Sequence, residues 1–172
     1  TEAELRLLPS YCRPKAGAIT GKSETVKRWF RVFGPDYKHM HHYCQGLVSI
    51  NRGDIASPDT SASVRNFNYQ RAIAEFNATE NKYATKTFKL LPELYVKRGD
   101  AHSRLKDYVS AEMDYLKAYN RYPKYPLGYK KLVDLYIKQG RIKEAREINN
   151  AALERFEKKK SFLKRAEKLK KM

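Results

Sequence analysis

Residues 92–125 read PELYVKRGDAHSRLKDYVSAEMDYLKAYNRYPKY, and residues 126–159 read PLGYKKLVDLYIKQGRIKEAREINNAALERFEKK. Placed one under the other, the two segments are offset by 34 residues and carry similar side chains at the same positions. The matched pairs are Pro92 with Pro126, Tyr95 with Tyr129, Ala111 with Ala145, and Ala118 with Ala152. Small residues at fixed positions let two helices approach closely, and aromatic residues fill the space between them. The two segments therefore predict consecutive helix–turn–helix units in an all-α protein.

Polar stretches and prolines mark the expected ends of these helices. The polar stretches 104–108 (RLKDY) and 138–143 (KQGRIK) predict turns inside the two units. Between the units, residues 121–126 (RYPKYP) carry prolines that stop one helix and begin the next. With 8 Gly and 7 Pro in 172 residues, the chain is poor in the residues that a turn-rich β protein needs.

This pattern resembles the tetratricopeptide repeat (TPR), a helix–turn–helix unit of 34 residues. The first unit supplies the residues typical of the motif, namely Tyr95, Gly99, Ala111, Tyr115, Ala118 and Pro123. The second supplies Tyr129, Tyr136, Ala145 and Ala152 but departs from the motif at Val133 and Asn149. The resemblance implies a short α-solenoid whose first helices line a concave face.

In TPR proteins, particular positions of each first helix contact a bound peptide. Carried over to this chain, the expected groove residues are Glu93, Val96, Asp100, Ser103 and Arg104 in the first unit, and Leu127, Lys130, Asp134, Ile137 and Lys138 in the second. Asparagine is missing from the positions of the Lys/Asn clamp that holds a C-terminal carboxylate in some TPR proteins. That specialised function is therefore not supported.

The remaining chain divides around these units. Residues 36–91 are predicted to form a degenerate TPR-like unit with a first helix over 36–53 and an inserted loop at 54–64. Its second helix is expected to carry Ala72, Phe76 and Thr79 at the spacing of the second helix of such a unit and to continue through residue 91. Residues 1–35 form an N-terminal extension or lid, and residues 160–172 a basic C-terminal cap helix.

The chain carries 36 Lys and Arg against 19 Asp and Glu, a net charge of +17. Such a charge favours acidic partners or polyanions, although a solvated surface is an equally good explanation. The aromatic residues fall mostly at repeat core positions and are not interleaved with lysines, so nucleic acid is not favoured. No apolar run reaches the roughly 18 residues of a membrane span.

The two cysteines, Cys12 and Cys44, allow either a disulfide, which we favour, or two unpaired buried thiols. His39 and His42 would share one face of a helix and are weak candidates for a metal site. The patterns typical of zinc and haem attachment, however, are absent. The alternative, which we prefer, makes these histidines groove or packing residues, with no metal and no cofactor.

No glycine-rich elbow or phosphate loop frames a nucleophile, so we do not expect an enzyme. The favoured function is a scaffold that binds a protein or peptide partner through its concave face. One alternative is a structural subunit that assembles head to tail into an oligomer or filament. A second is a basic polyanion-binding protein. The N-terminal third is faintly similar to uncharacterised exported bacterial TPR proteins, which implies a periplasmic or extracellular location, with the cytoplasm as the alternative.

Overall fold

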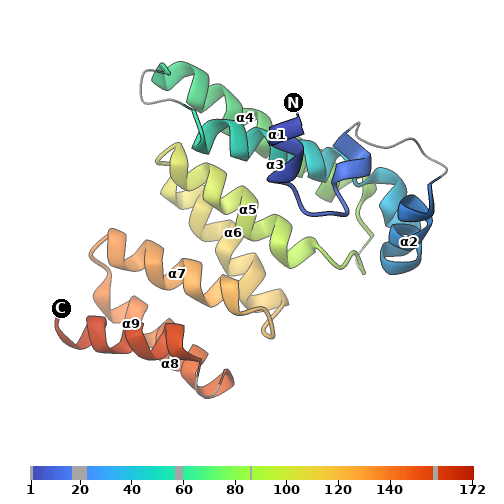
Figure 1. Ribbon diagram of the computed structural model, residues 1–172. Helices are drawn as coiled ribbons and strands as arrows, with labels where there is room; N and C mark the ends of the chain where they lie inside the picture. Colours follow the sequence, from blue (N-terminus) through green and yellow to red (C-terminus); the bar gives the residue numbers. More distant parts are fainter. Residues whose placement is uncertain (1, 17–22, 57–59, 86, 157–158) are drawn as a thin grey trace.

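The computed structural model describes residues 2–16, 23–56, 60–85, 87–156 and 159–172. Every regular element in these residues is helical, which confirms the all-α prediction (Figure 1). The longer helices are α3 (His41–Asp54), α4 (Ala62–Ala78), α5 (Leu91–Arg104), α6 (Tyr108–Arg121), α7 (Pro126–Lys138), α8 (Ile142–Arg155) and α9 (Lys160–Lys170). The shorter elements are α1 (Glu2–Arg6), α2 (Glu24–Phe33), the 3₁₀ turns η1 (Arg13–Ala16) and η2 (Gly34–His39), and the π turn η3 (Thr79–Tyr83).

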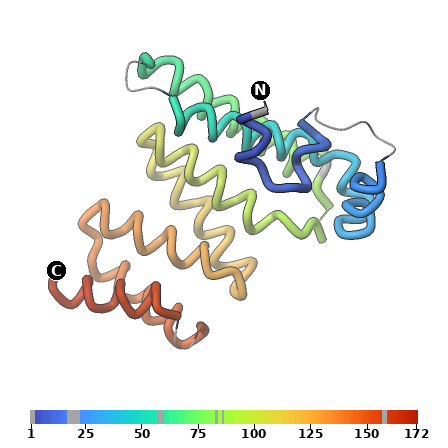
Figure 2. Tube along the Cα trace, in the orientation of Figure 1, coloured from blue at the N-terminus to red at the C-terminus, as the bar shows by residue number. Residues whose placement is uncertain are grey.

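The helices pack in sequential pairs. Helix α3 packs on α4, α5 on α6, and α7 on α8, while α9 packs on α8. Each pair also contacts the next, through α4 and α5 and then through α6 and α7. Figure 2 shows the result: from the pair α3 and α4 to α9, the colours of successive pairs follow one another across the molecule. Each pair is therefore held mainly by its neighbours in sequence.

The helix boundaries follow local chemistry. Pro92 and Pro126 lie in the first turns of α5 and α7, where a missing backbone N–H costs nothing. Helix α6 begins at a cap in which the Asp107 carboxylate accepts a hydrogen bond from the Ser110 backbone N–H at 3.1 Å. Gly140, with φ at +74°, makes the turn after α7. The two turns predicted inside the repeated segments are thus confirmed.

Close approach within the helix pairs depends on glycines, and two of these glycines occupy matching positions in successive pairs. A Cβ atom at Gly99 would lie 2.5 Å from the ring of Tyr115, and one at Gly53 would lie 2.5 Å from the ring of Tyr69. In both cases the tyrosine follows the glycine by the same number of residues along the chain. The pair formed by α3 and α4 therefore repeats the packing of α5 on α6.

The N-terminal half differs from the prediction in three details. The helix expected from residue 36 begins at His41, because residues 34–39 form the turn η2. The expected loop at 54–64 is shorter, since α3 includes Asp54 and α4 begins at Ala62; residues 57–59 lie outside the described residues. The expected long second helix ends at η3, and beyond it Asp36 accepts hydrogen bonds from the backbone N–H and the hydroxyl of Thr85. Ala72, Phe76 and Thr79, which the sequence places at the spacing of a second helix, are buried.

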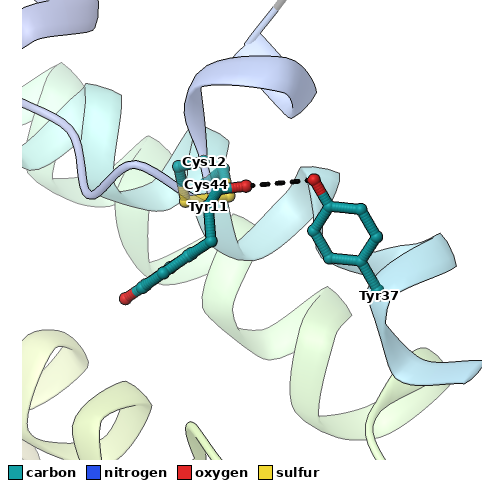
Figure 3. Close-up of a disulfide and its surroundings, with 4 residues drawn as sticks. All are labelled: Tyr11, Cys12, Tyr37 and Cys44. Carbon is teal, nitrogen blue, oxygen red and sulfur yellow. Dashed lines mark hydrogen bonds between the residues drawn. A yellow bond between two sulfur atoms is a disulfide. The ribbon is translucent and has the colours of Figure 1, made fainter. Parts of the chain in front are cut away.

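The N-terminal segment lies against α3, as the dark blue chain in Figure 1 shows. It buries Leu8 and Cys12 in the same core cluster as α3, α4 and α5. The Cys12–Cys44 disulfide is present, which confirms the favoured prediction, and both residues are fully buried. Figure 3 shows the disulfide beside a hydrogen bond that the Tyr37 hydroxyl donates to the carbonyl oxygen of Tyr11 at 3.3 Å. The segment is therefore fastened covalently and by packing.

Candidate functional site

One face of the molecule is formed by the first helices of the successive pairs. Helices α3, α5, α7 and α9 lie side by side, and one ion pair links each to the next (Figure 1). The links are Arg104 Nε to Asp54 Oδ1 at 2.9 Å, Lys131 Nζ to Asp100 Oδ1 at 2.6 Å, and an Arg165 guanidinium nitrogen to Asp134 Oδ1 at 2.8 Å. We call this surface the ladder face.

Two of the three aspartates of the ladder face are also hydrogen-bonded to the helix behind them. The Tyr69 hydroxyl donates to Asp54 Oδ1 at 2.9 Å, and the Tyr115 hydroxyl donates to Asp100 Oδ1 at 2.8 Å. Burial, and then the charge of Asp100, raise the pKa of Tyr115, so this hydroxyl stays protonated and remains a donor. Each of these two aspartates therefore joins three helices.

Behind Asp134 the corresponding position is Asn149. This side chain is buried, and its amide nitrogen donates to the carbonyl oxygen of Phe162 in α9 at 3.3 Å. Its Oδ1 atom is buried without a hydrogen-bond partner among the described residues. The departure from the repeat at Asn149 thus replaces a tyrosine–aspartate contact with a direct contact to α9.

A hollow of about 210 Å³ lies between α5 and α7 on the ladder face. Its lining includes half of the groove residues predicted from the sequence, namely Asp100, Ser103, Arg104, Asp134 and Lys138. Tyr115, Lys131 and Leu135 complete the lining. The 34-residue repeat thus brings predicted residues of both units to one depression.

All five groove residues predicted for the second unit lie along one stripe of α7. Leu127, Lys130, Asp134 and Ile137 follow one another at helical spacings of three and four residues, with Lys138 beside them. Leu127 is 38% exposed, Lys138 is exposed, and Lys130 and Ile137 are half-buried. This stripe therefore combines apolar and charged groups that a partner could contact.

Glu93 and Val96, the first two groove residues predicted in α5, lie outside this hollow. Val96 is 2% exposed and belongs to the core cluster that includes the N-terminal segment. Burial, and then the charge of Glu93, raise the pKa of Tyr11 to about 12, and the same two causes raise the pKa of Tyr43 and of Tyr125. Glu93 thus lies among tyrosines from the N-terminal segment, α3 and the turn before α7. In this structure the ladder face that is open to a partner begins beyond these two positions.

The histidines make contacts of a different kind. His42 Nδ1 lies 2.7 Å from Glu75 Oε2, and the rings of His41 and His42 are 4.1 Å apart. His39 lies in η2, outside α3. Among the described residues, no group of three or more His, Cys, Asp and Glu side chains could hold a metal ion. His42 is placed to join α3 to α4 through Glu75.

Behind the ladder face lies a buried charge network that the sequence did not reveal. Arg98 is 5% exposed and donates to both carboxylate oxygens of Asp114, at 2.8 and 2.7 Å, and to Asn77 Oδ1 at 2.7 Å. It also lies 2.7 Å from Glu80. Burial alone would raise the pKa of Glu80, but the charge of Arg98 and a hydrogen bond from Tyr95 hold it below its usual value of 4.5. The network fastens α5 to α6 and to the end of α4.

No protein-family model, curated protein or solved structure matches the chain. No helix in the described part of the chain is long and apolar enough to cross a membrane.

Proposed function

We propose that the chain is a non-enzymatic TPR scaffold, a short α-solenoid that binds a protein or peptide partner through the ladder face. The 34-residue repeat and the sequential helix pairs support the TPR interpretation. Successive helix pairs that stack in this way create extended binding surfaces in repeat proteins. The N-terminal segment then acts as a lid over the first part of the face, and α9 as the cap.

The single observation that carries this proposal is the composition of the hollow between α5 and α7. Five of its lining residues, listed above, were expected from sequence to contact a peptide, and they come from two different repeats. A hollow of this size holds a side chain of a partner but not a drug-sized ligand, because sites for such ligands are about 300 Å³ or larger. A polypeptide segment is therefore the best-fitting occupant.

The disulfide supports an oxidising compartment. Disulfides persist in secreted and periplasmic proteins and are rare in the reducing cytosol. The Cys12–Cys44 bond is thus in keeping with a periplasmic or extracellular location.

Selection of random peptides displayed on phage, with the full chain as bait, tests the proposal. We expect enriched peptides whose affinity falls about tenfold in Ser103→Trp, which fills the hollow. The matched control is Asn120→Trp, at an exposed position of α6. If no peptide is enriched, or if both variants bind the selected peptides equally well, the ladder face is not the binding site. Light scattering of the same sample detects self-assembly, which would favour the structural alternative.

A further inference from the structure

The aspartates of the ladder face already have cationic partners within the chain. The three aspartates that link the helices, Asp54, Asp100 and Asp134, each pair with a cation of the neighbouring helix. Lys130 and Lys138 lie on the stripe of α7, and neither pairs with a carboxylate among the described residues. The positive charge of this face is therefore available to a partner.

The two lysines stand at a definite separation. They are eight residues apart on α7, which corresponds to about 12 Å along the helix axis. Lys138 is held in place because its Nζ lies 4.7 Å from the centre of the Tyr108 ring. Asp134 lies midway between the two lysines on the same stripe, so the charges alternate along the helix.

An extended polypeptide fits this alternation. Side chains at positions i, i+2 and i+4 of an extended segment point to the same side, and i and i+4 are about 13 Å apart. Carboxylates at i and i+4 would therefore match Lys130 and Lys138. A carboxylate at i+2 would face Asp134, whose side chain remains 45% exposed although Arg165 pairs with it, and like charges in such a position oppose binding.

We propose that the ladder face binds an extended acidic segment of a protein partner, with acidic residues four apart and an uncharged residue midway between them. This inference rests on the proposed function and specifies its partner. Apolar side chains of the segment contact Leu127, which precedes Lys130 on the stripe, and Ile137, which lies beside Lys138. A nucleic acid fits less well, because its evenly spaced phosphates would also face the exposed part of the Asp134 carboxylate.

Fluorescence anisotropy with synthetic peptides tests this spacing of the acidic residues. The probe is a labelled peptide with glutamates at i and i+4 and leucine at i+2. The comparison peptides carry glutamates at i and i+2, or glutamines in place of both glutamates. At about 0.15 M salt we expect the i, i+4 peptide to bind about tenfold more tightly than either comparison peptide.

Charge variants locate the contact. Lys130→Glu combined with Lys138→Glu should weaken binding of the i, i+4 peptide at least about tenfold. The control combines Arg71→Glu with Lys143→Glu, at exposed positions of α4 and α8, and makes the same change in net charge. This control should leave binding within about twofold of the original chain, and circular dichroism should show that both variants are folded.

Several outcomes would overturn the inference. The first two are equal affinity for the i, i+4 and i, i+2 peptides, and an equal loss of peptide affinity in the lysine variant and in its control. The others are tight binding of a single-stranded oligothymidylate that both variants weaken, and no binding of the i, i+4 peptide at about 1 mM. Phage-selected peptides that lack the acidic spacing but are sensitive to Ser103→Trp would also overturn it, while leaving the proposed function intact. Failure of the selection itself would remove the proposed function.

Discussion

Replacement of Arg98 by methionine tests the energetic reasoning about the buried network most directly. Methionine is similar in length and apolar, so packing is largely kept while the charge is lost. Asp114, only 4% exposed, would then be buried without its bidentate partner. Breaking a buried pair in this way costs about 3–5 kcal/mol. For a chain of this length, we expect the melting temperature to fall by about 6–20 °C.

Urea unfolding followed by circular dichroism, with the disulfide intact, measures this loss. Two companion variants make the measurement specific. Arg98→Met with Asp114→Leu replaces the whole pair by apolar groups and should recover most of the loss. Arg165→Met removes an ion pair whose Asp134 side chain is 45% exposed, and should cost less than about 1 kcal/mol. The reasoning is refuted if Arg98→Met costs no more than Arg165→Met, or if the double variant is no more stable than Arg98→Met alone.

Three further predictions concern the fold. Cys12→Ser with Cys44→Ser opens a loop with a sequence separation of 32 and should lower the free energy of unfolding by about 3–4 kcal/mol, a loss that a reductant reproduces in the original chain. Gly99→Ala places a Cβ against the Tyr115 ring and should cost about 1–3 kcal/mol in urea unfolding; an unchanged midpoint would contradict the close packing. Because the pKa of Glu80 is lowered in the folded state, its contribution to stability should be complete above pH 4.5 and be lost as the pH falls below it. In urea unfolding at a series of pH values, Glu80→Gln should therefore make the free energy of unfolding fall less steeply at acid pH.

The repeat made much of the C-terminal half predictable. Gly99, Tyr115 and the alanines of the two units report packing between helices that are close in sequence, so a periodic pattern encodes them. The ion pairs were missed because Asp100 and Asp134 were considered singly, as groove residues. A signal was present, since Lys131 follows Asp100 and Arg165 follows Asp134 at the same spacing of 31 residues.

The N-terminal half was less predictable because its structure depends on contacts between distant residues. The extended segment after η3 is held by Asp36, which lies 49 residues earlier than Thr85. The N-terminal segment packs on α3 through Leu8 and Cys12, and no periodic pattern marks such a contact. The equal spacing of Gly53 to Tyr69 and of Gly99 to Tyr115 was visible in the sequence and would have revealed the register of the first helix pair.

The position of the disulfide has a mechanical consequence. If the molecule is pulled by its two ends, the covalent link between residues 12 and 44 keeps the intervening chain from extending. That chain, with a sequence separation of 32 between the two cysteines, would otherwise add about 110 Å of contour length. Under tension the helix pairs beyond Cys44 can unfold and extend, while the chain between Cys12 and Cys44 keeps its length as long as the disulfide is intact. Reduction of this one bond would therefore release the length that remains between Cys12 and Cys44.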